Sequence, residues 1–541
     1  MNENFIRNLF AGIVDPDGIH PYPSMNPDER ETVDMFLDQV KKFAEESIDG
    51  EAIDKAGVIP EEVLDGLKEM GIFGMIIPEA YGGYGFSLTA YSRVMEEISR
   101  HCASTSITIG AHESIGMKGI ILFGNEEQKQ KFLPDLATGE KLAAYALTEP
   151  DAGSDASNLK TVAKYDENEN LFVLNGTKQW ITNGGMADIY TLFASTGRQG
   201  IVTAFIVTSD MPGFSVGKYE DKLGLRASKT AQLILENVKV PPENILYKQG
   251  RGFKVAMEIL NTGRASLSAS CIGAAKEVMR FATDHALQRR QFGAPIAELE
   301  MIRSKFYAMA STIYAMESMV YHTTSLVDGN IGDYSTETAV SKFFCTDALW
   351  WIINECLQVS GGNGYMNEYP YQRFLRDARI NMIFEGTNEV NRMYAGYTGL
   401  KHAARILGSE TKPSGGSFAG FSPDSLKPYA EELDRLASRF GARCMKLVEL
   451  HGPEAYKMEY HLERIADAVA GLYSGAAVLA RTAAAGDNSK ALALARGYLE
   501  LVLPKIRYAM DAEEHAADEI KDEISSLIYE GGGFPHERWA L

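Results

Sequence analysis

The stretch LFVLNGTKQWITNG, at residues 171–184, decides the fold class of this 541-residue chain. Its β-branched and aromatic residues form short runs that asparagine and glycine divide, which is typical of strands joined by turns. Three further runs have the same texture: DIYTLFAST at 188–196, IVTAFIVTS at 201–209 and AQLILENVKV at 231–240. Residues 146–250 are therefore predicted to form a β domain of hairpins.

Helical periodicity surrounds this β domain on both sides. Segments such as ETVDMFLDQVKKFAEESI (31–48) and EEVLDGLKEMGIFG (61–74) repeat apolar residues at intervals of three and four. Helices and strands occupy separate blocks, which argues against the alternating pattern of a doubly wound sheet. We predict an α+β multi-domain protein with an N-terminal helical domain at 1–145, a middle β domain at 146–250, a helical bundle at 251–400, a linker at 401–424 centred on GSETKPSGGSFAGFSPD, and a C-terminal helical extension at 425–541.

Composition excludes several classes of function. Hydrophobic residues make up 45% and charged residues 23% of the chain, so a large core can form. The formal net charge of −20 argues against a nucleic-acid binder and against unassisted docking on an anionic membrane. The ten histidines include no HExxH motif, so no metal site is expected. The cysteines form no CxxC pair, which favours a reduced compartment; they are Cys102, Cys271, Cys345, Cys356 and Cys444.

Targeting and membrane-spanning signals are not evident. The stretch MNENFIRNLFAGIVDPDG at residues 1–18 has early acidic residues and no long apolar run, so neither a signal peptide nor a transit peptide is expected. No stretch of about 20 predominantly apolar residues predicts a membrane span. We expect a cytoplasmic protein of bacterial type. Peripheral contact of the extension with the inner membrane stays open, beside the alternative that the extension only covers a dimer.

Familiar nucleotide and hydrolase signatures do not fit. The chain has no GxGxxG after a strand and no GxxxxGK[ST], so neither a dinucleotide fold nor a P-loop is supported. The segment GFSVG at 213–217 matches GxSxG, but a nucleophile elbow needs a strand before it and a helix after it. The following KYEDKLGLRAS is more typical of a loop or strand, so a hydrolase is not predicted.

Two segments near the β domain look unusual for packing alone, and the first of them suits a polar planar ligand. YALTEPDAGSD at 145–155 combines the hydroxyls of Thr148 and Ser154 with a flexible Ala-Gly pair. An ordinary turn would account for the same residues. GTKQWITNG at 176–184 places a tryptophan among alternating threonines, which is also the pattern of a half-buried strand.

Two later segments suit an anion and a base. In RRQFGAPI at 289–296, Arg289 could bind a phosphate and Phe292 could stack on a base, although a helix end before Gly and Pro explains the pattern equally. In FEGTNEVNR at 384–392, Glu385 follows the apolar run NMIF, so burial could raise its pKa. A solvated acid at the start of the next helix is the alternative.

Together, and in this order, these four segments resemble the acyl-CoA dehydrogenase family, most closely its very-long-chain branch. The resemblance covers nearly the whole chain and includes HPYPS, IPEAYGGYG, GAHESIGMKGIILFG, GFKVAMEILNTGR, CLQVSGGNGY, RDARI and HLERIADAVAGLY. It implies an acyl-CoA dehydrogenase fold: a helical domain, a middle β-barrel-like domain and a helical bundle with FAD between them, followed by the extra helical domain of that branch. Asp151 stands where the family commonly has glycine, a change that leaves the hydroxyls in place.

The resemblance also implies roles for individual residues. Glu385 is the expected catalytic base; some branches carry a glutamate just before the helix arginine instead, but here Gly263 occupies that position. Arg289 and Phe292 are expected to reach the adenine half of a neighbouring subunit's FAD. The full set expected to contact FAD is Tyr145, Leu147, Thr148, Gly153, Ser154, Trp180, Thr182, Arg289, Phe292, Gln358, Gly361, Gly362, Thr387 and Glu389. The set expected to contact substrate is Ser154, Asn261, Arg264, Gly386, Gly116 and Gly119.

The implied activity is α,β-dehydrogenation of an acyl-CoA by a homodimer that passes electrons to an electron-transferring flavoprotein. Gly116 and Gly119 lie three residues apart, on one face of an expected helix. Close helix packing would explain them, but the very-long-chain resemblance favours a groove for acyl chains of about C12 or longer. An acyl-CoA oxidase and a non-catalytic assembly protein that retains the fold are the alternatives.

Overall fold

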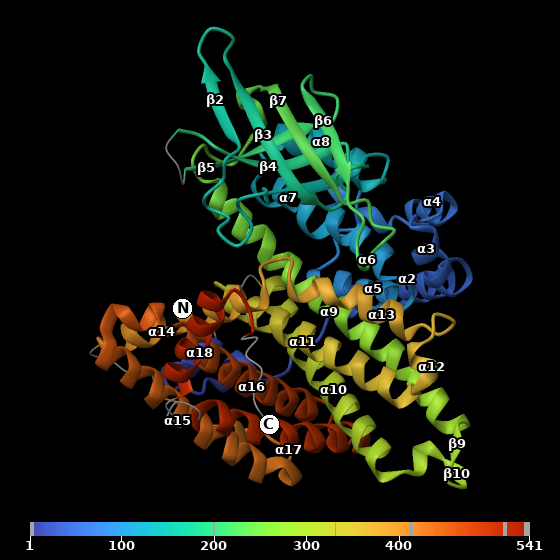
Figure 1. Ribbon diagram of the computed structural model, residues 1–541, viewed down its shortest axis with the longest axis vertical. Helices are drawn as coiled ribbons and strands as arrows, with labels where there is room; N and C mark the ends of the chain where they lie inside the picture. Colours follow the sequence, from blue (N-terminus) through green and yellow to red (C-terminus); the bar gives the residue numbers. More distant parts are fainter. Residues whose placement is uncertain (1–4, 198–200, 330–331, 410–414, 512–516, 535–541) are drawn as a thin grey trace.

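The computed structural model describes residues 5–197, 201–329, 332–409, 415–511 and 517–534 (Figure 1). The first block is helical, and its Asn26 and Asn125 side chains cap helices by accepting backbone N–H groups of the first turn. The elements are α1 (Phe5–Leu9), α2 (Pro27–Ser47), α3 (Gly50–Ala56), α4 (Glu61–Glu69), α5 (Leu88–His101), α6 (Ala103–Gly110), the π-helix η4 (Ala111–Gly116), α7 (Lys118–Phe123) and α8 (Glu126–Ala137).

The middle block is the predicted β domain. The four runs singled out above form β3 (Leu171–Ile181), β4 (Ile189–Ser195), β5 (Val202–Thr208) and β7 (Ala231–Val240). They are joined by β1 (Ala143–Ala146), β2 (Val162–Asp166), β6 (Phe214–Tyr219) and β8 (Ile245–Leu246) in the order β6-β7-β3-β2-β4-β5-β8, with β1 also on β4. Ser215 of the GxSxG match lies exposed in β6, so it forms no nucleophile elbow.

Hairpins alone do not account for this sheet. β1 and β2 both pair with β4 in parallel, at different points along the same strand. Parallel strands need a long connection rather than a tight turn, so the local sequence pattern could not predict this pairing. The β1–β4 pairing connects the N-terminal helices to the sheet. Residues of the loop after β1 then line a cavity together with residues of α5, α6 and α9.

The third block is built around α9 (Gly252–Gln288), which packs against α5 and α11. Gly273 allows the closest approach, because a Cβ there would lie 1.9 Å from the carbonyl oxygen of Glu96. The other elements are α10 (Glu300–Asp328), α11 (Ser335–Ser360), α12 (Gly362–Tyr365), α13 (Tyr371–Ala378), α14 (Asn388–Leu407) and the short strands β9 (Arg290–Gln291) and β10 (Ala294–Pro295). The extension forms α15 (Lys427–His451), α16 (Glu459–Ala484), α17 (Ser489–Asp511) and α18 (Ala517–Gly531).

Two segments pack differently from their predicted assignments. The sequence places residues 5–19 with the first helical domain, but they share a core with α9–α11 and α14–α17. Phe418, in the predicted linker, is fully buried and contacts the Phe5 ring edge-on at 6.1 Å. Hydrophobic burial thus ties both segments to the C-terminal helices, beside which Figure 1 places the N-terminus. Within the described ranges, no helix has the length and apolar character needed to cross a membrane.

Candidate functional site

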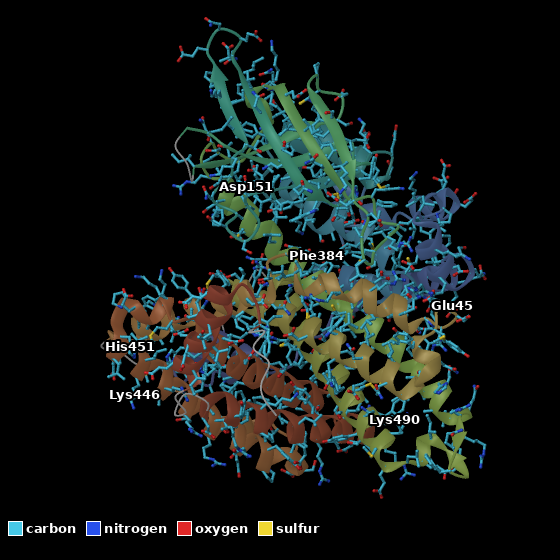
Figure 2. The ribbon with its side chains drawn as sticks, in the orientation of Figure 1. Glu45, Asp151, Phe384, Lys446, His451 and Lys490 are labelled. Atoms are coloured by element: carbon cyan, nitrogen blue, oxygen red, sulfur yellow. The ribbon has the colours of Figure 1, made fainter. Side chains whose placement is uncertain are left out.

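A cavity of about 690 Å³ lies where the three blocks meet. Its walls come from α5, α6 and η4, from the loop after β1, from the end of β3, from α9 and from the turn before α14. Phe384 on that turn lines the cavity, and Figure 2 shows it at the junction between the β domain and the helical bundle. A concave space of this volume suits a small-molecule ligand.

Glu385 has the geometry of a poised base. Its backbone φ is +56°, and Gly386 follows with a φ of +84°, so two successive residues occupy the left-handed region. That conformation is unusual for glutamate and points to strain that the surroundings must hold. Carboxylate oxygen Oε2 is shielded from solvent and accepts no hydrogen bond. Burial raises the pKa of Glu385 to about 7, against the opposing charges of Lys342 and Arg264.

Helix α9 presents Gly263 and Arg264 directly to this glutamate. A Cβ on Gly263 would lie 3.0 Å from Glu385 Oε1, so the two expected base positions face the same point. Arg264 donates from Nε to the backbone oxygen of Glu385 at 3.0 Å and from Nη1 to Asn261 Oδ1 at 3.3 Å. The guanidinium therefore holds the turn rather than neutralising the carboxylate through a direct ion pair.

The loop after β1 and the end of β3 form the opposite wall. Seven residues expected to contact FAD line the cavity together: Tyr145, Leu147, Thr148, Gly153, Ser154, Trp180 and Thr182. The Trp180 side chain is 60% exposed and stands at a φ of +56°, which leaves its indole ring available to a ligand. Nothing lies within 4 Å of a Cβ built on Gly153. Hydroxyls, free backbone and an open aromatic face suit a planar heterocycle.

A buried ion pair that sequence reasoning missed fixes this loop. Lys178 Nζ donates to Glu149 Oε1 at 2.7 Å and to the Leu147 oxygen at 3.0 Å, and both side chains are buried. Glu149 also accepts the backbone N–H of Thr161 at 3.1 Å. A lysine within a strand pattern reads as a solvent-facing residue, so only the tertiary fold reveals the pair.

Comparison with known proteins identifies this arrangement. Residues 30–140, 144–238 and 250–397 match the N-terminal, middle and C-terminal domains of acyl-CoA dehydrogenase. The very long-chain specific acyl-CoA dehydrogenase of Homo sapiens is 36% identical over 515 residues, which cover 89% of this chain and 79% of that protein. The chain belongs to the acyl-CoA dehydrogenase family.

Other relatives show how the acyl-CoA dehydrogenase fold is distributed along the chain. An acyl-CoA dehydrogenase of Bacillus subtilis is 42% identical over 365 residues, covering 66% of this chain and 95% of its own length. The crystal structure of an acyl-CoA dehydrogenase complexed with FAD from Bacillus anthracis superposes with a TM-score of 0.79 at 31% identity. It covers 97% of this chain and 94% of that chain, so the similarity includes the C-terminal extension.

Several residues expected to contact FAD do not line the cavity. Arg289 and Phe292 follow the last turn of α9, where the Phe292 side chain is 94% exposed. Figure 1 shows β9 and β10 at the end of the bundle farthest from the β domain. None of the following lines the cavity: Arg289, Phe292, Gln358, Gly361, Gly362, Thr387 and Glu389. Contact of these residues with FAD stays a prediction, and so does the reach of Arg289 and Phe292 across a subunit boundary.

The predicted groove at Gly116 and Gly119 is wrong. Neither residue lines the cavity. A Cβ on Gly116 would lie 2.6 Å from the Ala111 oxygen, and one on Gly119 would lie 2.9 Å from methyl groups of Ile259 and Leu246. Both glycines therefore allow close packing against β1, α9 and β8, and the cavity lining in this region comes from other residues of η4 and α6.

Proposed function

We propose that this chain is an FAD-dependent acyl-CoA dehydrogenase that converts long-chain or very-long-chain acyl-CoA to trans-2-enoyl-CoA, with Glu385 as the base that takes the α-proton. The observation that carries the proposal is that Glu385 lines the cavity with its Oε2 atom shielded from solvent and accepting no hydrogen bond. A pKa of about 7 suits general-base catalysis near neutral pH.

The residues opposite Glu385 fit an isoalloxazine ring. Thr148, Ser154 and Thr182 offer hydroxyls, Trp180 offers an exposed aromatic face, and Gly153 leaves open space. FAD, when bound there, supplies the acceptor for the hydride that leaves the β-carbon. The α-proton passes to a Glu385 oxygen, and the electron pair of that C–H bond becomes part of the new double bond. Closure of the cavity around the acyl chain excludes water and keeps the carboxylate basic.

The apolar side chains in the cavity lining favour a long acyl chain as substrate. They include Met95, Ile107, Ile115, Leu267, Ala274 and Ile353, contributed by five different helical segments. The similarity to very long-chain specific enzymes favours the same substrate class. We also propose a cytoplasmic homodimer that delivers electrons to an electron-transferring flavoprotein.

Anaerobic reduction of the purified protein tests the proposal. The protein should be yellow, and palmitoyl-CoA should bleach its flavin absorbance faster than butyryl-CoA does. Glu385→Gln should keep the flavin but bleach at least 100-fold more slowly, because positioned acid–base groups contribute about 10²–10⁴-fold. Hydrogen peroxide release in air at the rate of turnover would instead indicate an acyl-CoA oxidase, and a colourless protein would indicate an assembly role.

A further inference from the structure

A second buried lysine lies beside the proposed base. Lys342 of α11 is fully buried, and its Nζ donates to the Gly386 oxygen at 2.9 Å and to Asn388 Oδ1 at 2.8 Å. In the part of the chain that the structure describes, no carboxylate lies within 4.0 Å of this ammonium group. A buried cation without an ion-pair partner is costly, so its retention calls for a reason.

The carbonyl that Lys342 binds belongs to the turn that aims Glu385. Glu385 and Gly386 both have positive φ, and their two carbonyl oxygens are each held by a buried cation. Arg264 Nε donates to the Glu385 oxygen at 3.0 Å and Lys342 Nζ to the Gly386 oxygen, which also accepts Asn391 Nδ2 at 2.7 Å. These hydrogen bonds all go to backbone oxygens, so none of the three side chains donates to the Glu385 carboxylate.

We propose that Lys342 is a positioning residue for dehydrogenation: it holds the Glu385–Gly386 turn through the Gly386 carbonyl and places its positive charge near the carboxylate without bonding to it. This inference rests on the proposed function. It explains why a cation is needed where a neutral donor such as Asn391 already binds the same oxygen.

The electrostatics of the site agree with that geometry. Burial lowers the pKa of Lys342 to about 8, whereas the charge of Glu385 opposes this decrease. In turn, the positive charge of Lys342 lowers the pKa of Glu385, against the effect of burial, and does so more strongly than the charge of Arg264. The titratable and charged groups that face Glu385 are Arg264 and Cys271 on α9, Lys342 on α11, Tyr91 on α5 and Tyr145 on β1. Lys342 and Arg264 are the cations in that set, so removing Lys342 should raise the pKa of Glu385.

The test compares Lys342→Met with wild type in the FAD-loaded protein. Bleaching by palmitoyl-CoA under anaerobic single-turnover conditions reports proton abstraction without any electron acceptor. We expect a rate at least tenfold lower at pH 7, a smaller deficit at pH 9, and an unchanged palmitoyl-CoA concentration for half-maximal rate. Lys342→Arg, which keeps the charge, should recover part of the rate and the wild-type pH profile.

Two further variants separate positioning from general destabilisation. Lys276→Met removes a cation that is 38% exposed and pairs with Glu96 and Glu317, none of which lines the cavity. It should leave the pH profile unchanged. Asn391→Leu removes the neutral donor to the Gly386 oxygen, and should slow bleaching without moving the profile.

The inference is overturned if folded Lys342→Met has the wild-type pH profile, or if Lys276→Met shifts the profile equally. Should Lys342→Met fail to fold, Lys342→Gln replaces it, and a wild-type pH profile in folded Lys342→Gln would overturn the inference. Failure of wild-type protein to bleach with any acyl-CoA would instead overturn the proposed function.

Discussion

Replacement of Glu385 by glutamine should make the protein more stable while it makes it inactive. The pKa of this carboxyl is about 7 in the folded protein, against 4.5 for an exposed glutamate. The folded state therefore holds a proton that the unfolded state releases between these two values, so stability falls as pH rises through that window. The stabilisation that comes from this protonation is fully present below pH 4.5 and is lost above pH 7.

The size of the effect follows from the same two pKa values. One pKa unit corresponds to about 1.36 kcal/mol, so ionised Glu385 destabilises the fold by about 3 kcal/mol at pH 8 and about 1 kcal/mol at pH 5. Glutamine resembles the neutral acid and escapes this cost. The advantage of Glu385→Gln over wild type should therefore grow by about 2 kcal/mol between pH 5 and pH 8.

Urea denaturation of the two proteins at pH 5 and pH 8 measures this difference. Glu389→Gln is the matched control, because Glu389 lies on the next helix but its pKa is lowered by a backbone hydrogen bond and by Thr387. Its replacement should reduce stability slightly at pH 8 rather than increase it. Equal midpoints for Glu385→Gln and wild type at pH 8 would refute the claim that the carboxylate is held in a desolvated site.

Further outcomes test the remaining parts of the site. Palmitoyl-CoA bleaching by wild type should rise about tenfold from pH 6 to pH 8, because ionisation of Glu385 with a pKa of about 7 governs it; a flat profile would contradict this. Gly119→Met should lower thermal stability and slow the turnover of long-chain and short-chain substrates alike, since its Cβ would meet packed methyl groups. A selective loss of activity on long-chain substrates would instead support a groove at this position. Glu385→Gly with Gly263→Glu should recover part of the activity lost in Glu385→Gly, because the two positions adjoin; no recovery would show that the second position aims a carboxylate wrongly. Arg289→Ala should weaken both FAD retention and the dimer, which absorbance and sedimentation check together, and a fully yellow dimer would exclude a role across subunits.

The chemistry-bearing segments could be recognised from sequence because each depends on residues close together in the chain. The runs that became β3, β4, β5 and β7 show their period locally. Glu385 was identifiable from its apolar approach and its motif, and the cavity then brought it together with Asn261 and Arg264. The glycines at 116 and 119 show where such reasoning stops, since a missing side chain marks either a groove or a contact, and only the neighbours decide which.

The sequence by itself determined the order of helical and β blocks and the family, and it singled out the proposed base, because periodicity and motifs are properties of short stretches. Tertiary structure alone decided which charges are buried. Lys178 and Lys342 have the sequence context of surface residues, yet both are buried. Lys178 binds residues 29 and 31 positions away, and Lys342 binds a residue 44 positions away. Tertiary structure likewise packed Phe5 against Phe418, although the two residues are far apart in the sequence. Desolvation depends on everything that surrounds a group, so the pKa of Glu385 and the turn that aims it exist only in the folded protein.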